Sequence, residues 1–388
     1  MFSNRVPNER APNRLARALQ TARAHGPLID LTLSNPTCAG LAYPSDVLKT
    51  LSDSSALTYR PEPLGLGSAR EAVAETYKRR GLRLGADRIV LTASTSEAYS
   101  ILFKLLCDSK GRRVLTPVPS YPLFDYLTRL DEVESRRYAL EYHGTWTIAR
   151  GELDRAWTDD TRAVLAVSPN NPTGSIVRDT DAAELASLCA ERDAALIVDE
   201  VFWDYPLGTA LPEPHPFEAP SCLTFRLGGL SKSAGLPQVK LGWIAVDGPA
   251  NLVSEATDRL ELICDTYLSV STPVQVAAPS LIEHGHRVRE QILVRIRTNY
   301  DLLRARAAAA GGVTLLDADA GWSAVLRVPA TRSEEDLVLD LLERDRVVVH
   351  PGYFFDFPHE AFLVASLLPE PHAFASGVDR ILERVHAA

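Results

Sequence analysis

Short runs of apolar residues, each bounded by polar or turn-forming residues, recur along the chain up to about residue 250. Examples are RIVLTAS (88–94), AVLAVSPNN (163–171) and AALIVDE (194–200). Continuous apolar runs of this length are typical of strands that are buried on both faces of a sheet. Stretches with helical periodicity, such as DTDAAELASLCAERD (179–193), lie between them. This alternation predicts an α/β fold in which helices sandwich a mostly parallel sheet.

The pattern changes after about residue 280. It then predicts one long helix at 286–311 and three short strands at 322–328, 346–350 and 361–368. A second helix is predicted between the first two strands, and a closing helix at 372–386. Because 388 residues exceed the size at which single cores stop growing, we expect two domains. We predict a large domain over 45–280 and a smaller α+β domain formed by 1–44 together with 281–388.

Polar residues follow nearly every strand candidate of the large domain. In open α/β sheets, ligands bind outside the carboxyl ends of the strands, so we expect these residues to converge on one site. They are Ser94, Thr95 and Ser96, then Ser120 and Tyr121, Asn170 and Asn171, Asp199 and Glu200, and Ser231 and Lys232.

Composition narrows the class of protein. Hydrophobic residues make up 46% of the chain and charged residues 23%, as in ordinary globular proteins, and the net charge of -9 argues against a nucleic-acid partner. No apolar stretch reaches the roughly 18 residues of a membrane span, and the opening MFSNRVPNERAPNR has no signal-peptide core. The five cysteines are scattered without a C-x-x-C pair, which predicts reduced thiols and a cytoplasmic location. We expect no membrane partner and no metal.

Lys232 stands in GGLSKSAGLP (228–237), between two apolar strand candidates. A lone lysine after a strand is more often a surface residue. Small neighbours, however, let the backbone approach a ligand closely, and partial burial lowers the pKa of an amine. Such a lysine can form a Schiff base with a carbonyl group.

Three further strings carry candidate chemistry. Asp199 ends a very apolar strand, where it either caps the strand or holds a proton on a pyridine nitrogen. In SPNNPTG (168–174), Asn171 either shapes an Asn-Pro turn or donates to a phenolic oxygen. TASTSEA (92–98) predicts a helix N-terminus at Ser94 to Ser96, which both caps the helix and can cradle a phosphate.

Together these strings resemble the class I/II aminotransferases, the fold type I enzymes of pyridoxal phosphate. The resemblance runs from about residue 28 to the C-terminus, and the order NPTG, DE, SK-x-x-G-L-P and LGW is highly specific. It implies a transferase that works by a ping-pong exchange on an amino acid or related amine, through an internal aldimine on Lys232, which then acts as the general base.

The resemblance also assigns the cofactor-binding residues. Asp199 resembles the partner of the pyridinium nitrogen, Asn171 the donor to O3′, and Tyr121 in PSYP the aromatic ring that stacks on the cofactor. The phosphate group would be bound by Thr95 and Ser96, by Lys240 where the family usually has arginine, and by Tyr59 lent from a neighbouring subunit. The last assignment implies a homodimer with shared active sites.

Two departures from the family pattern concern the reaction. Phe202 stands where a tyrosine usually donates to O3′, which predicts a higher internal-aldimine pKa than in a Phe202→Tyr variant. Val364 in AFLVASLL stands where an arginine usually clamps the substrate carboxylate. Either another cation, such as Arg60 or Arg14, binds that carboxylate, or it is left unclamped.

The unclamped case leaves other reactions open. A pyridoxal-phosphate lyase that eliminates at a Cβ–S bond and a decarboxylating oxidative deaminase of specialised metabolism are the alternatives to transamination. Trp322 and the segment HPGYFFDF (350–357) either line the substrate side or belong to the core of the small domain. A regulator with a DNA-binding module is expected to fit less well, because only about 30 residues precede DLTLSNPT. A nucleotide-binding protein also fits less well, since GLSKS lacks the spaced first glycine of a P-loop.

Overall fold

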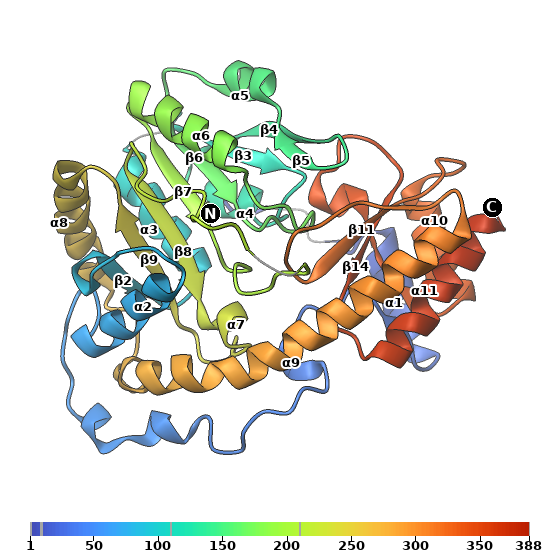
Figure 1. Ribbon diagram of the computed structural model, residues 1–388, viewed down its shortest axis with the longest axis horizontal. Coiled ribbons are helices and arrows are strands. Elements are labelled where there is room, and N and C mark those ends of the chain that lie inside the picture. Colours follow the sequence, from blue (N-terminus) through green and yellow to red (C-terminus); the bar gives the residue numbers. More distant parts are fainter. Residues whose placement is uncertain (1, 8–10, 109–110, 209–210, 388) are drawn as a thin grey trace.

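The structure is a computed structural model that describes residues 2–7, 11–108, 111–208 and 211–387. Its centre is an eight-stranded sheet in the order β2-β9-β8-β7-β6-β3-β4-β5, parallel from β8 to β4 and antiparallel at both edges (Figure 1). The strands are β2 (Ile89–Thr92), β3 (Arg113–Val118), β4 (Glu134–Tyr142), β5 (Trp146–Ile148), β6 (Thr161–Val167), β7 (Ala195–Asp199), β8 (Thr224–Gly229) and β9 (Gly242–Asp247). The predicted α/β fold with a mostly parallel sheet is confirmed.

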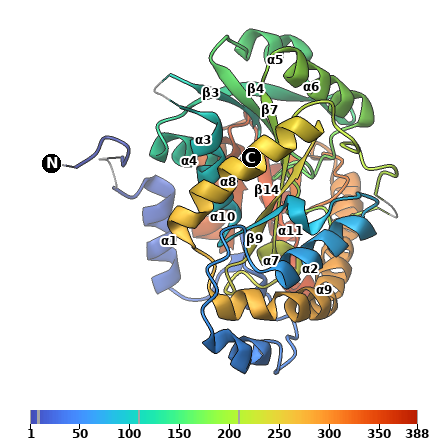
Figure 2. The same ribbon diagram turned by 90° about the vertical axis from the view of Figure 1, so that its left-hand side faces the viewer.

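Helices cover both faces of this sheet (Figure 2). Along β7, Ile197 packs into one core cluster while Leu196 and Val198 pack into another, so the strand is buried on both faces as its apolar run predicts. The covering helices are α2 (Gly67–Arg79), α3 (Thr95–Leu106), α4 (Phe124–Leu130), α5 (Arg150–Ala156), α6 (Asp179–Glu191) and α8 (Ala250–Tyr267). Among the described helices, none is both long and apolar enough to cross a membrane.

A second, four-stranded antiparallel sheet lies in the C-terminal part, in the order β10-β11-β14-β13. Its strands are β10 (Thr314–Leu315), β11 (Ser323–Arg327), β13 (His350–Pro351) and β14 (Phe362–Ser366). The helices α1 (Arg14–Ala24), α10 (Glu334–Arg344) and α11 (Pro371–His386) lie beside it, and β1 (Ile29–Asp30) pairs with β12 (Val347–Val348).

One helix, α9 (Thr272–Ala310), runs from the large sheet to the small one (Figure 1). It begins earlier than the periodicity predicts, because Pro273 fits the first helical turn, where no internal N–H partner is needed. The predicted domain boundary at residue 280 therefore falls inside this helix, and the division at 44/45 and 280/281 stays a prediction.

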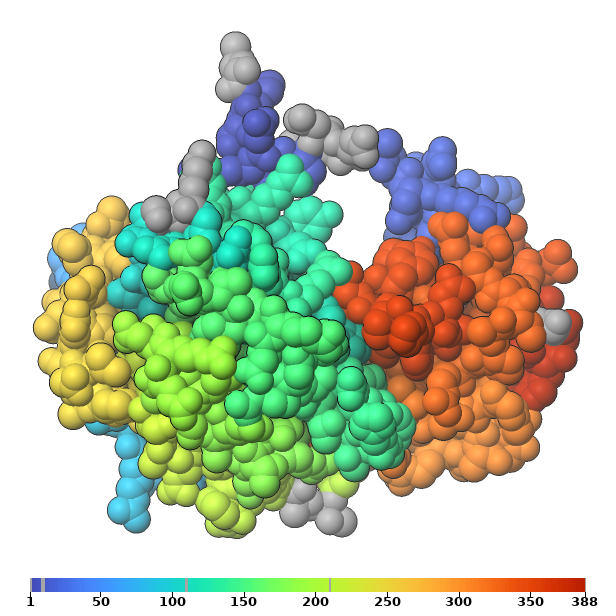
Figure 3. Space-filling view, turned by 90° about the horizontal axis from the view of Figure 1, so that it is seen from above, coloured from blue at the N-terminus to red at the C-terminus, as the bar shows by residue number. Residues whose placement is uncertain are grey.

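The N-terminal segment contacts both parts of the molecule (Figure 3). Arg5 forms an ion pair with Glu132 at 2.7 Å, beyond the end of α4, and Arg14 in α1 forms one with Asp336 in α10 at 2.9 Å. The described residues of this segment thus form ion pairs with both parts of the molecule.

Candidate active site

Asp199 is the last residue of β7 and is 6% exposed. The Tyr99 hydroxyl donates to its Oδ2 at 2.7 Å, and the Val201 N–H donates to its Oδ1 at 3.1 Å. Burial raises the pKa of Asp199 to about 6, although both hydrogen bonds oppose that shift. The result is a buried carboxylate held by two neutral donors, which favours a cationic partner.

Lys232 lies beyond the end of the neighbouring strand. It belongs to the short helix α7 (Leu230–Ser233), which follows β8 directly, and β8 pairs in parallel with β7. Its Nζ lies 4.7 Å from the ring centroid of Trp322 and 5.4 Å from that of Phe202. Burial lowers the pKa of Lys232 to about 8, while the charge of Asp199 works in the opposite direction.

The first turn of α3 forms a ready anion site. Ser94 caps the helix by accepting from the Glu97 N–H at 3.1 Å, and Thr95 and Ser96 follow with backbone N–H groups at the N-terminus. Gly242, the first residue of β9, lies very close to this turn, because a Cβ atom at position 242 would be 2.9 Å from the Ser94 carbonyl carbon. The close approach brings the loop that carries Lys240 to the same end of α3.

Lys240 has a left-handed backbone with a φ of 60°, and its side chain is exposed. It forms no ion pair or hydrogen bond within the described ranges. Its position two residues before Gly242, which packs against the start of α3, is compatible with a role at the phosphate group.

Asn170, rather than its neighbour, holds the loops after β3 and β6 together. Its Nδ2 donates to the Pro119 carbonyl at 3.0 Å and to Thr173 Oγ1 at 2.9 Å, and its Oδ1 accepts from Ser120 Oγ at 2.9 Å. The side chain of Asn171 forms no hydrogen bond to any described residue, which leaves it available to a ligand.

Tyr121 follows Ser120 in the loop after β3. It is half-buried and makes an edge contact with Phe124 at a centroid distance of 5.7 Å. Burial raises the pKa of Tyr121, and the nearby charge of Asp199 adds to the effect. Tyr121 in the loop after β3, Asp199 at the end of β7 and Lys232 after β8 thus lie at the carboxyl ends of three strands of one sheet.

Tyr59 lies apart from this group. It is 69% exposed and lines a shallow pocket with Leu268 and Ser269, which follow α8. Neither Lys232 nor Asp199 lines that pocket. Within one chain, the structure therefore does not bring Tyr59 to the other candidate residues.

Position 364, where the family usually has the arginine that binds the substrate carboxylate, lies in apolar surroundings. Val364 is 1% exposed and packs in a cluster with Trp146, Phe355 and Phe357. Two of the aromatic residues of 350–357 therefore belong to the core, and the Phe355 carbonyl accepts from the Ser120 N–H at 3.0 Å.

Of the two cations considered as substitutes for the clamp, Arg14 is engaged elsewhere. It pairs with Asp336 at 2.9 Å and with Glu335 at 3.7 Å on the exposed surface between α1 and α10. Arg60 lines the same shallow pocket as Tyr59. Neither side chain reaches Lys232 within one chain.

Two site residues escape the sequence patterns. Tyr99 lies inside a helical run, and Tyr205, whose hydroxyl donates to the Lys232 carbonyl, lies in an irregular loop. Glu200, which was expected to join the site with Asp199, instead forms a buried ion pair with Arg226 at 2.9 Å. The arginine inside the apolar run LTFRLGG is a sequence signal for such a buried acidic partner.

The arrangement fits pyridoxal phosphate. A protonated ring nitrogen would supply the cationic partner that the buried carboxylate of Asp199 favours, and the buried amine of Lys232 suits reaction with an aldehyde. The N–H groups at the start of α3 suit a phosphate group.

Sequence comparison agrees with this chemistry. The family model of aminotransferase class I and II matches residues 27–366. An alanine aminotransferase of Mycobacterium tuberculosis is 26% identical over 366 residues, covering 91% of this chain and 84% of the relative. The glutamate-pyruvate aminotransferase AlaA of Escherichia coli is 24% identical over 344 residues, covering 85% and 84%.

Solved structures agree on the fold. An alanine aminotransferase from Pyrococcus furiosus has a TM-score of 0.87 at 21% identity and covers 96% of both chains. An aminotransferase from Escherichia coli has a TM-score of 0.87 at 21% identity and covers 100% of this chain and 98% of its own. The chain belongs to the class I and II aminotransferases and is a pyridoxal-phosphate-dependent aminotransferase.

Proposed function

We propose that the chain transfers the amino group of an amino acid or related amine at the carboxyl ends of β7 and β8, where Asp199 and Lys232 lie. The observation that carries this proposal is the Lys232 amine, whose pKa is lowered to about 8 by burial, at the same end of the sheet as the buried carboxylate of Asp199. The residues proposed to bind the cofactor are Lys232, Asp199, Asn171, Tyr121, Thr95, Ser96, Lys240 and, across a subunit interface, Tyr59.

Each residue has a distinct task in this proposal. Pyridoxal phosphate, when bound, supplies an aldehyde that condenses with amines and a ring that accepts electrons from Cα. Lys232 would hold the cofactor through its aldehyde, would release it to the amino donor, and would then move the proton at Cα as a general base. Asp199 would hold the proton on the ring nitrogen, and Asn171 would donate to the phenolic oxygen.

The residues on the substrate side of the site favour an amino donor whose carboxylate is not bound by an arginine at position 364. Val364 lies in an apolar cluster, and Phe202 and Trp322 flank the Lys232 amine. We propose a donor with an apolar side group. Alanine is the first candidate, because two relatives are named alanine aminotransferase and glutamate-pyruvate aminotransferase.

The test is a donor panel on the purified holoenzyme, with alanine, glutamate, aromatic amino acids and simple amines, and with pyruvate or 2-oxoglutarate as acceptor. We expect one oxo product for each amino group transferred. In the Lys232→Ala variant, we expect the loss of both the transfer and the visible absorption band of the lysine-bound cofactor. Lys78→Ala is the matched control, since the Lys78 side chain is 71% exposed and, among the residues that the structure describes, forms an ion pair only with Glu75 of its own helix. Release of ammonia or CO2 in place of transfer would contradict the proposal.

We also propose that the active form is a homodimer in which each subunit lends Tyr59 to the phosphate of the other. Large apolar side chains are exposed near this residue and on α8: Leu57 is 89%, Leu262 72% and Tyr267 56% exposed. A contact with another subunit would cover such exposed apolar side chains. Tyr59 itself lies apart from Lys232 within one chain.

Subunit mixing tests this arrangement. Lys232→Ala subunits still carry Tyr59, and Tyr59→Ala subunits still carry Lys232. A mixed dimer would contain one complete site, so we expect the mixture to regain activity above either variant alone. Sedimentation should give twice the chain mass of 42.5 kDa. Monomeric enzyme with full activity would rule the shared site out.

A cytoplasmic location is proposed on composition. All five cysteines are free thiols, three of them buried, as a reducing compartment maintains. Fractionation of the source cells, followed by immunoblotting, tests this assignment.

A further inference from the structure

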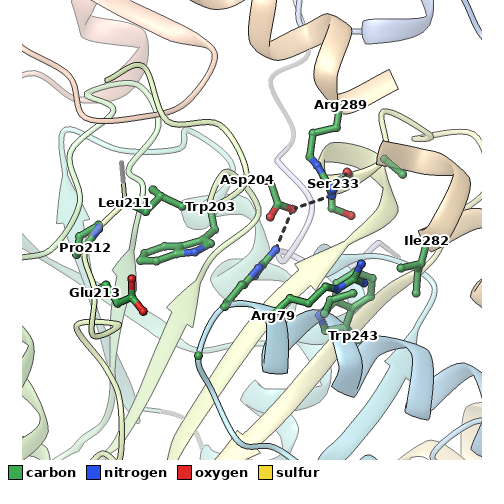
Figure 4. A pocket seen from close by; sticks show the side chains of 14 residues that line it. Arg79, Trp203, Asp204, Leu211, Pro212, Glu213, Ser233, Trp243, Ile282 and Arg289 are labelled. Carbon is green, nitrogen blue, oxygen red and sulfur yellow. Dashed lines mark hydrogen bonds and ion pairs between the residues drawn. The ribbon is translucent and has the colours of Figure 1, made fainter. Parts of the chain in front are cut away.

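A cavity of about 440 Å³ lies behind the segment that carries Lys232. It is bounded by the C-terminal end of α2, by Ser233 of α7, by α9 and by the segment that follows β7 (Figure 4). None of the residues proposed to bind the cofactor lines it. Its volume is within the range of sites for small molecules.

One side of the cavity is cationic. Arg79, Arg80 and Arg289 all line it. Asp204 is shared between two of them, at 2.9 Å from Arg80 and 3.8 Å from Arg289, and Arg80 also pairs with the buried Glu200 at 3.9 Å. Arg79 is exposed, and within the described ranges its side chain donates to the Glu75 carbonyl of its own helix at 3.3 Å and pairs with no carboxylate. The positive charge that no described carboxylate neutralises on this side is therefore that of Arg79.

The opposite side is largely apolar. Trp203, Leu211 and Pro212 lie together there, with Glu213 next to them (Figure 4). His215 lies against the Trp203 ring with a centroid distance of 4.0 Å, so the indole is held in place while it lines the cavity. A flat or apolar group suits this side.

From these two sides we infer that the cavity binds a small organic anion, in which a carboxylate or phosphate group contacts Arg79 and Arg289 and an apolar body contacts Trp203. Guanidinium groups bind both kinds of oxyanion by charge-assisted, bidentate hydrogen bonds. The site is distinct from the catalytic one, and the inference does not depend on the proposed substrate.

The site also touches the catalytic segment. Arg289 Nη1 donates to the Ser233 carbonyl at 3.3 Å, one residue from Lys232. The same guanidinium group would contact the anion.

Calorimetric titration of the holoenzyme at low salt tests the inference, because bound cofactor blocks its own phosphate site. The probes are phenyl phosphate, benzoate, inorganic phosphate and benzyl alcohol. We expect saturable binding, one per chain, of phenyl phosphate or benzoate, and the stronger of the two identifies the oxyanion. Inorganic phosphate and benzyl alcohol should each bind at least about tenfold more weakly, because each lacks one half of the ligand.

Arg79→Gln should weaken the stronger probe about tenfold, and added salt should weaken it as well. Arg83→Gln is the matched control: it removes the same charge from an exposed arginine that forms no ion pair within the described ranges. Unchanged melting temperatures would show that both variants fold. Absence of saturable binding, equal losses in both variants, or competition by a saturating amino donor would each overturn the inference.

Discussion

At the scale of single residues, the Lys232 amine is subject to opposing influences. Burial favours the neutral amine, while Asp199 and the faces of Phe202 and Trp322 favour the ammonium ion. A pKa of about 8 keeps a usable fraction of neutral, nucleophilic amine at neutral pH. The residues that surround the amine therefore set the pH range in which it can react.

Replacing Trp322 by leucine should lower the pKa of Lys232 in the apoenzyme. The centroid of the indole ring lies 4.7 Å from Nζ, and a cation–π contact of about 0.5–2 kcal/mol corresponds to roughly 0.4 to 1.5 units of pKa. The measurement is the pH dependence of Lys232 carbamylation by cyanate, followed by mass spectrometry. Trp322→Phe keeps an aromatic face and should change the pKa less. A rise in the Trp322→Leu variant would show that the ring acts by excluding water instead.

Replacing Phe202 by tyrosine adds a hydroxyl group next to the Lys232 amine. Phe202 is 7% exposed and its ring lies 5.4 Å from Nζ, so a tyrosine at this position would place a donor where the family usually has one. We expect the visible absorption of the holoenzyme to change with pH at a lower midpoint in Phe202→Tyr than in the native enzyme. A spectral titration measures this midpoint, and an equal or higher value in the variant would refute the expectation.

At the scale of elements, the strands that the sequence predicts are those buried on both faces. β6, β7 and β9 are continuous apolar runs. β4, with the sequence ESRRYALEY, was not predicted, because only Tyr138 along it is fully buried and charged side chains interrupt the pattern. The short β5 follows it at the same edge of the sheet. The residues at the ends of strands can therefore be predicted for the interior strands of the sheet, because burial on both faces gives these strands continuous apolar sequences.

The pair Asn170 and Asn171 separates a structural role from a proposed functional one. The string SPNNPTG does not show which asparagine is tied to the fold, because that depends on loops after two different strands. Asn170→Ala should lower the free energy of unfolding by about 2–4 kcal/mol, since it leaves several buried groups unpaired. Asn171→Ala should leave the melting temperature nearly unchanged and weaken transamination. Thermal denaturation with activity assays distinguishes the two, and equal melting losses would contradict the assignment.

At the scale of the whole molecule, the sequence predicts the cofactor side of the site better than the substrate side. The cofactor side is built from consecutive strand ends of one sheet, so order along the chain becomes proximity in space. The substrate side depends on packing between two sheets. There, Val364 meets Trp146 from the large sheet and Phe357 from the small domain, and no local pattern shows this contact.

The buried carboxylate of Asp199 also affects the stability of the whole apoenzyme. Its pKa is about 6 in the folded chain against 3.8 for an ordinary aspartate, so between these values the native state binds more protons than the unfolded state. The free energy of unfolding therefore falls as pH rises through this window, by up to about 3 kcal/mol. Asp199→Asn removes that cost and can still accept a hydrogen bond from Tyr99. We expect apo Asp199→Asn to be more stable than the native apoenzyme at pH 7 and equal to it near pH 3.5, while its transamination is lost. Urea denaturation at the two pH values measures this difference, and a variant that is less stable at pH 7 would mean that Asp199 stabilises the fold.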